Sequence, residues 1–128
     1  MKLLLSSNSF TTPQLVKATA DLCGKPAEEI SVAVINEAYA TERGDKRWVL
    51  DNLNSAATNF GGEFDLVNLL ALPMGQVEEL ISAKDVIFVP GGDPDYLMSV
   101  FLETGFDAVL PSLLRGKVYV GSSAGAMV

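Results

Sequence analysis

The sequence contains no histidine, and Cys23 is the one cysteine among its 128 residues. Without histidine the chain has no side chain that ordinarily titrates near neutrality, so it cannot carry a Ser-His-Asp mechanism alone. A lone cysteine excludes an internal disulfide and fits a reducing compartment, so we expect a cytoplasmic protein. The same two scarcities leave no spacing typical of a metal site, and no cofactor is expected.

Positive charge and long apolar runs are also scarce. Lys and Arg total 9 against 16 Asp and Glu, which gives a net charge of -7. This balance disfavours nucleic acid and anionic membranes, because both favour a basic face. The apolar run that follows Met1 and Lys2 is too short for a signal peptide, and no stretch is long enough to span a bilayer. We therefore expect neither a nucleic-acid partner nor a membrane.

What the sequence does contain is a regular alternation of strand-like and helix-like segments. Apolar runs of strand length occur at residues 2–6, 30–35, 64–69, 85–89 and 117–120. Helical spacing occurs between them at residues 13–23, 42–59, 74–83, from 94 onward, and 106–114. This pattern indicates a three-layer, doubly wound α/β fold with a parallel sheet covered on both faces, and a flavodoxin-like strand order is expected. With no linker, residues 1–128 are expected to form a single domain.

Several local signals fix the expected helices more closely. A capping residue precedes proline at Thr12-Pro13 and at Asp93-Pro94, and Gly24 ends the first of these helices. Spacing predicts that the second helix has an inner face made of Leu97, Met98, Phe101 and Leu102. It also predicts an inner stripe on the helix at 42–59, formed by Trp48, Leu53 and Ala56. Pro111 is expected in the first turn of the helix at 106–114.

The segment Gly121-Ser122-Ser123-Ala124-Gly125 has the form G-x-S-x-G. It follows the strand at 117–120 and precedes an apparent helix start, which is the context of a nucleophile elbow. Such a turn would lift the Ser123 hydroxyl clear of the sheet and aim the Ala124 N–H where an oxyanion forms. Ser122 occupies the free position and is the weaker candidate. The alternative is a turn of small residues without chemistry.

A second glycine-rich turn, Gly91-Gly92-Asp93, follows the strand at 85–89. Parallel strands present their carboxyl ends at one edge of a sheet, so this turn should lie beside Ser123 if the two strands are neighbours. The Gly92 N–H would then be a second oxyanion donor, and Gly91 and Asp93 would be candidates for substrate contact. Asp93 is also a preferred helix N-cap, and we favour that role for it.

Three segments resemble the dipeptidase E and cyanophycinase group of serine peptidases, which has the class I glutamine amidotransferase-like fold. They are LLLSSNS at 3–9, VIFVPGGD at 86–93 and KVYVGSSAGA at 117–126. The resemblance implies that Ser123 is the nucleophile and that Gly92 and Ala124 supply the oxyanion N–H groups. In that family the histidine and its acidic partner follow the elbow. The resemblance therefore implies that residues 1–128 are the N-terminal part of a longer domain.

The expected function is hydrolysis of short peptides through Ser123. Pro94-Asp95-Tyr96 departs from the residues of dipeptidase E itself, which puts a preference for N-terminal aspartate in doubt. One alternative is a shortened, inactive relative that acts as a binding or structural domain. Another is an amidotransferase or isomerase relative, but these normally have cysteine at the elbow. Truncation would leave Met127, Val128 and one sheet face bare, so a homo-oligomer formed through that surface is also expected.

Overall fold

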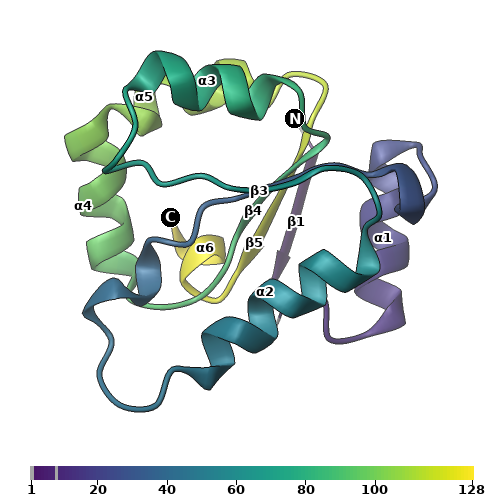
Figure 1. The fold of residues 1–128 in the computed structure, drawn as a ribbon, viewed down its shortest axis with the longest axis horizontal. Coiled ribbons are helices and arrows are strands. Elements are labelled where there is room, and N and C mark those ends of the chain that lie inside the picture. Colours follow the sequence, from purple (N-terminus) through teal and green to yellow (C-terminus); the bar gives the residue numbers. More distant parts are fainter. Residues whose placement is uncertain (1, 8) are drawn as a thin grey trace.

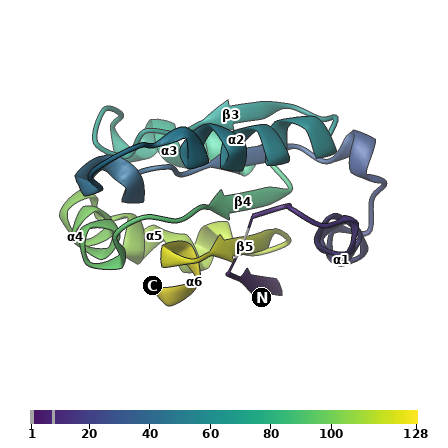
Figure 2. The same ribbon diagram turned by 90° about the horizontal axis from the view of Figure 1, so that it is seen from below.

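The structure is a computed structural model that describes residues 2–7 and 9–128, so Asn8 of the segment 3–9 lies outside the described residues. Its centre is a parallel sheet of five strands: β1 (Lys2–Ser6), β2 (Val32–Val34), β3 (Phe64–Leu66), β4 (Val86–Val89) and β5 (Val118–Ser122). Their order across the sheet is β1-β5-β4-β2-β3. Figure 2 shows this stack, with β3 at the top and β1 beside the N label at the bottom.

Helices cover both faces of the sheet. They are α1 (Pro13–Cys23), α2 (Arg47–Asn59), α3 (Met74–Ser82), α4 (Pro94–Thr104), α5 (Phe106–Leu113) and α6 (Ala124–Met127), with short 3-10 turns η1 (Ala27–Glu29) and η2 (Ala38–Thr41). In Figure 1, α3, α4 and α5 lie on one side of the strands, and α1 and α2 lie on the other. The predicted three-layer, doubly wound α/β fold is therefore confirmed.

The strand order differs from the flavodoxin order at β1. In a flavodoxin-like sheet the first strand lies inside, whereas here β1 lies at the edge and pairs with β5 from Lys2↔Val118 to Ser6↔Ser122. Strand β4 pairs with the other side of β5. The strand that leads to Ser123 is therefore held on both sides by backbone hydrogen bonds, which fixes the position of the turn that follows it.

Strand side chains alternate between two apolar layers, as a sheet buried on both faces requires. One layer packs with α1 and α2 and contains buried residues of several elements: Phe10, Val32, Val34, Val86, Phe88, Val118 and Val120. The other packs with α3, α4 and α5 and includes Ala33, Ile87, Val89, Tyr119, Val77, Leu97 and Phe106. Cys23 packs against the first layer, and its burial raises the pKa of the thiol, as expected for a small core residue.

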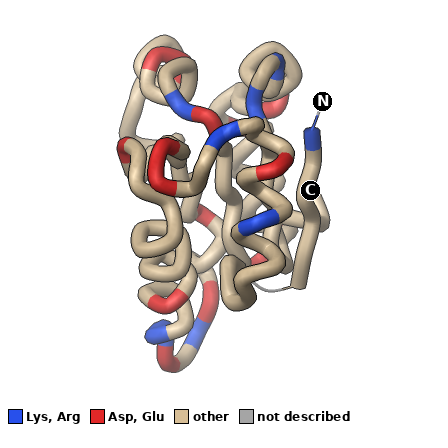
Figure 3. Tube along the Cα trace, turned by 90° about the vertical axis from the view of Figure 1, so that its right-hand side faces the viewer, with Lys and Arg blue, Asp and Glu red and all other residues tan. Residues whose placement is uncertain are grey.

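The start and end signals that the sequence predicts for the helix at 13–23 are confirmed. Thr12 caps α1, because its hydroxyl oxygen accepts a hydrogen bond from the Leu15 amide at 3.3 Å. Pro13 occupies the first helical position, and Gly24 ends the helix with a φ of 69°. None of the helices in the described ranges is both long and apolar enough to cross a bilayer. In Figure 3 the basic residues are spread among the acidic ones along the chain.

Two details of α4 and α5 differ from the prediction. Leu102 is 61% exposed, and Val100 is buried instead, because the inner stripe of α4 runs through Leu97, Val100 and Phe101 at spacings of three and four. Pro111 lies inside α5 rather than in its first turn. The helix begins directly after Gly105, so the proline falls beyond the turn whose amides need no helical acceptor.

Candidate active site

The turn between β5 and α6 carries the most unusual backbone in the described part of the molecule. Ser123 has φ 54° and ψ −112°, and it is the only non-glycine residue with positive φ among those that the structure describes. Such a conformation costs on the order of 1–3 kcal/mol and persists only where the surroundings enforce it. The Ser123 side chain is exposed, whereas Ser122 and Ala124 on either side are buried. The fold therefore tolerates backbone strain at the one residue of this turn whose hydroxyl reaches solvent.

Glycine is required on both sides of Ser123 because three backbone segments meet there. A Cβ at Gly125 would lie 1.8 Å from the Val89 carbonyl oxygen at the end of β4. A Cβ at Gly121 would lie 2.4 Å from the Gly125 carbonyl oxygen. No side chain fits at such distances, so the two glycines permit α6 to begin directly against β4 and β5.

Hydrogen bonds hold this turn from three directions. The Ser123 amide donates to the Ser6 carbonyl at the end of β1 at 2.9 Å, and the Ala126 amide donates to the Ser123 carbonyl at 3.0 Å. From strand β5, the buried Tyr119 hydroxyl donates to the Gly125 carbonyl at 2.7 Å. Burial raises the pKa of Tyr119, so the hydroxyl keeps its proton at ordinary pH. The strained residue is thus tied to β1, β5 and its own helix.

The second predicted turn does lie beside Ser123. A Cβ built on Gly91 would be 3.1 Å from the Ser123 Cβ and 3.5 Å from its Oγ. Gly92 has φ 145°, and a Cβ there would lie 2.2 Å from the Ala38 carbonyl, so glycine is needed at this position as well. Gly91, Gly92 and Ser123 all line one cleft of about 410 Å³. The two glycine-rich turns that the sequence singles out thus meet at the carboxyl edge of the sheet.

Asp93 is placed differently from the two glycines. Its Oδ1 accepts hydrogen bonds from the amides of Asp95 at 2.9 Å and Tyr96 at 3.2 Å, and its Oδ2 accepts one from the Thr41 hydroxyl at 3.3 Å. These bonds cap α4, and Asp93 is not among the residues that line the Ser123 cleft. The carboxylate therefore has the capping role that the sequence analysis favoured.

Apart from Ser122, the weaker nucleophile candidate, the other residues of the cleft were not predicted from the sequence. Its remaining wall is formed by Ser7, Ser9, Glu42, Trp48, Asn52 and Ser122. The Ser9 hydroxyl donates to the Asn52 side-chain oxygen at 2.8 Å, which ties α2 to the loop after β1. Asn52 and Glu42 carry no signal of their own, because a polar residue on a helix or loop reads as solvent-exposed.

Trp48 corrects one prediction. The spacing places it in the inner stripe of a helix over 42–59, but in the structure it is half-buried and lines the cleft. Helix α2 begins only at Arg47, and its buried positions are Val49 and Ala56. Consecutive helical residues point about 100° apart, so the residue before Val49 turns away from the core and towards Ser123.

No group of three or more His, Cys, Asp or Glu residues that could hold a metal ion occurs within residues 2–7 and 9–128.

The profile of peptidase family S51 matches residues 3–128. The chain belongs to peptidase family S51. This is the dipeptidase E family, so the resemblance drawn from the segments at 3–9, 86–93 and 117–126 is confirmed.

Two curated peptidases are similar to this chain in sequence. The chain is 25% identical over 129 residues to an uncharacterized peptidase of Pasteurella multocida, and the match covers 100% of this chain and 60% of the relative. It is 27% identical over 133 residues to an uncharacterized peptidase of Listeria monocytogenes, with the same two coverages. The chain thus spans 60% of the length of these two relatives.

Solved structures show the same fold. A crystal structure of a candidate peptidase E from Listeria monocytogenes superposes with a TM-score of 0.80 at 24% identity, covering 98% of this chain and 60% of that one. The structure of a peptidase from an acI-B1 actinobacterium superposes with a TM-score of 0.66 at 22% identity, covering 98% and 55%. These two peptidase structures therefore share the fold of this chain over nearly its whole length.

Proposed function

We propose that the chain provides the nucleophile of a serine peptidase that hydrolyses short peptides. The observation that carries the proposal is Ser123, a solvent-exposed hydroxyl on a strained residue between two glycines that no larger residue can replace. Strain and exposure at one residue favour a functional role over a mere turn of small residues. This geometry supports the proposal that the turn is a nucleophile elbow.

In the proposed reaction the Ser123 Oγ attacks the peptide carbonyl carbon, and a base takes the hydroxyl proton. The base then passes this proton to the leaving amine as the C–N bond breaks, and water hydrolyses the acyl-enzyme. The sequence has no histidine, so the base and its acidic partner are proposed to come from residues outside these 128.

Two backbone N–H groups are proposed to stabilise the tetrahedral oxyanion. The Ala124 amide belongs to the first turn of α6, where backbone amides have no acceptor within the helix. The Gly92 amide belongs to the turn that lines the same cleft as Ser123. The Ser123 amide is already bonded to the Ser6 carbonyl, so it is not a candidate donor.

A fluorophosphonate probe applied to the natural full-length protein tests this proposal. The expected result is a single adduct on Ser123, located by mass spectrometry, which disappears in Ser123→Ala. Ser112→Ala is the matched control, because Ser112 is exposed on α5 and does not line the Ser123 cleft. An adduct on Ser122 instead of Ser123 would refute the assignment of the nucleophile.

The absence of histidine favours one alternative, an inactive relative that serves as a binding or structural domain. A full-length protein that folds, keeps Ser123 and takes no label would support this alternative over the peptidase. The lone cysteine supports a cytoplasmic location as part of the same proposal.

A further inference from the structure

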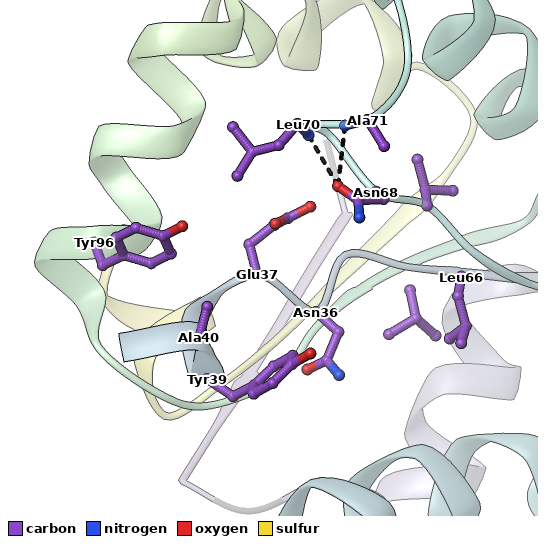
Figure 4. A pocket seen from close by; sticks show the side chains of 11 residues that line it. Asn36, Glu37, Tyr39, Ala40, Leu66, Asn68, Leu70, Ala71 and Tyr96 are labelled. Atoms are coloured by element: carbon purple, nitrogen blue, oxygen red, sulfur yellow. Dashed lines mark hydrogen bonds between the residues drawn. The ribbon is translucent and has the colours of Figure 1, made fainter. Parts of the chain in front are cut away.

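A second pocket, of about 480 Å³, opens at the carboxyl ends of β2 and β3 and shares no lining residue with the Ser123 cleft. The 3-10 turn η2 lies between the two, and its Ala38 carbonyl accepts a hydrogen bond from the Asp93 amide at 2.8 Å. Figure 4 shows the side chains that point into this pocket. It belongs to the part of the fold where α/β sheets bind ligands, at the ends of strands beside a change in winding direction.

The central group of this pocket is the Glu37 carboxylate. Glu37 is 8% exposed, and its Oε1 accepts a hydrogen bond from the Leu69 amide at 2.7 Å. Its other oxygen, Oε2, has no hydrogen-bond partner within the described residues. Every fully buried side-chain nitrogen or oxygen among these residues does have a partner, so Oε2 is not fully buried. Oε2 therefore opens onto the pocket. In Figure 4 the carboxylate lies in the middle, between Tyr96 on one side and Asn68 on the other.

The charge of Glu37 is not explained by its bond to Leu69. A carboxylate is costly to bury, and a neutral amide can accept the same backbone hydrogen bond. Asn68 accepts such backbone hydrogen bonds from the two residues that follow Leu69, because its Oδ1 accepts from the Leu70 amide at 3.0 Å and the Ala71 amide at 3.1 Å. The residues that line the pocket include no Lys or Arg to compensate the negative charge. An external cation would do so.

The walls of the pocket suit a cation on an aliphatic stem. Tyr39 from η2 and Tyr96 from α4 both line it, and aromatic faces attract ammonium groups. Leu66 and Leu70, which are 60% and 51% exposed, line it as well and would be covered by methylene groups. Asn36 adds a polar side chain at the end of β2.

We propose that this pocket binds a primary ammonium group on a short aliphatic stem, with the Glu37 Oε2 accepting its hydrogen bonds between Tyr39 and Tyr96. The ligand is either a lysine side chain of a peptide or a free alkylamine, since both carry the same group. The site is independent of the proposed nucleophile, because it shares no residue with the Ser123 cleft.

The test is a titration of the ¹⁵N-labelled full-length protein at about pH 7.5, where an alkylammonium keeps its charge, followed through the Leu69 amide signal. The probes are n-butylamine and Nα-acetyl-lysine amide, and the neutral controls are n-butanol and Nα-acetyl-norleucine amide. Saturable changes in the chemical shift of the Leu69 amide are expected with the two amines and not with the neutral compounds. Tighter binding of the lysine amide than of butylamine assigns the site to peptides, and equal or weaker binding assigns it to free amines.

Variants connect the binding to the named groups. Glu37→Gln keeps the Leu69 hydrogen bond and should weaken amine binding about ten- to a hundredfold, because a charge-assisted bond becomes neutral. Tyr96→Leu keeps the Glu37 carboxylate and should weaken amine binding severalfold. This variant serves as a second test if Glu37→Gln fails to fold. Ser123→Ala should leave amine binding unchanged.

Three outcomes would overturn the site. They are no saturable shift with either amine, equal binding of the neutral compounds, and unchanged affinity in a folded Glu37→Gln protein. Failure of fluorophosphonate labelling at Ser123 would leave this proposal untouched, since none of these measurements requires hydrolysis.

Discussion

The Tyr119 hydroxyl donates a 2.7 Å hydrogen bond to the carbonyl of Gly125, two residues after the strained Ser123. Tyr119 belongs to β5 and Gly125 to α6, so this bond closes the strand-turn-helix unit around Ser123. The residue is 5% exposed, and the bond is shielded from competing water. It acts on the turn from a side chain that does not line the cleft.

Removing this hydroxyl should loosen the turn. Tyr119→Phe keeps the ring and leaves the Gly125 carbonyl without its buried donor, so we expect a loss of about 1–2 kcal/mol in the free energy of unfolding. Fluorophosphonate labelling of Ser123 should slow in parallel. Urea denaturation and labelling rates measure the two effects. Unchanged labelling in a destabilised variant would mean that the bond supports the fold but not the nucleophile.

The strain at Ser123 predicts an unusual gain from glycine. Ser123→Gly and Ser123→Ala both remove the hydroxyl, but only glycine adopts φ 54° without steric cost. We expect Ser123→Gly to be about 1 kcal/mol more stable than Ser123→Ala, after the greater chain entropy of unfolded glycine is subtracted. Equal unfolding free energies in urea would show that the turn carries no strain.

Two glycine-to-alanine changes should have opposite effects. Gly125→Ala places a methyl group 1.8 Å from the Val89 carbonyl oxygen, so we expect destabilisation of about 3 kcal/mol. Beyond its chain neighbours and the backbone of its own helix, Gly75 in α3 has no heavy atom within 4 Å of the point that an alanine methyl would occupy. Gly75→Ala should therefore stabilise by about 0.5 kcal/mol through helix propensity. Thermal unfolding of both proteins checks the pair. A tolerated Gly125→Ala would contradict the close contact of α6 with β4.

Glu37 should make stability depend on pH. Burial raises its pKa, opposed by the Leu69 hydrogen bond, so the folded protein retains this proton to higher pH than the unfolded chain. Its contribution to stability is therefore complete below the unfolded pKa of about 4.3 and is lost as pH rises through the raised folded value. Glutamine keeps the acceptor and does not titrate.

We accordingly expect Glu37→Gln to be more stable than the natural sequence at about pH 7–8, with a difference that shrinks towards about pH 4. The other titratable groups that line the pocket are Tyr39 and Tyr96. Urea denaturation at several pH values measures the difference. A difference that is independent of pH would mean that Glu37 does not change its protonation state on folding.

The edge strand predicts self-association of the 128-residue chain. Leu3 and Leu5 on β1 are 48% and 52% exposed, and Met127 of α6 is 72% exposed. We expect oligomers by light scattering and a shift towards monomer in Leu3→Lys/Leu5→Lys, since edge lysines oppose strand pairing. The double variant Leu50→Lys/Leu102→Lys is the control, because these leucines are at least as exposed but lie on helices. A monodisperse monomer of the unaltered chain would refute the prediction.

Local covalent constraints explain which predictions from sequence succeeded. Proline fixes φ and glycine permits positive φ, so Thr12-Pro13, Gly24 and Asp93-Pro94 define helix ends without reference to the rest of the chain. The turn around Ser123 is marked by two glycines within five residues, which are needed for close backbone approach rather than for positive φ. Each of these features depends on fewer than about ten consecutive residues, which a sequence displays directly.

The features that sequence did not predict depend on where separate segments meet. Trp48 faces the cleft because α2 begins at Arg47 rather than at residue 42, and its buried stripe runs through Val49 and Ala56. The pocket around Glu37 joins the ends of β2 and β3 to α4, so no contiguous sequence pattern marks it. A signal did exist, since Glu37 is an acid shortly after an apolar strand in a fold that binds ligands at strand ends.

Strand β1 comes before the other four strands in the chain and pairs with the last of them, β5. Each of its residues pairs with a β5 residue more than a hundred positions later in the sequence, and Ser6 also accepts the Ser123 amide. During synthesis β1 must therefore wait for its partner strand until β5 has emerged from the ribosome. Such distant pairing slows folding and lengthens exposure to chaperones and aggregation. The turn around Ser123 is consequently completed only when β1 and β5 come together.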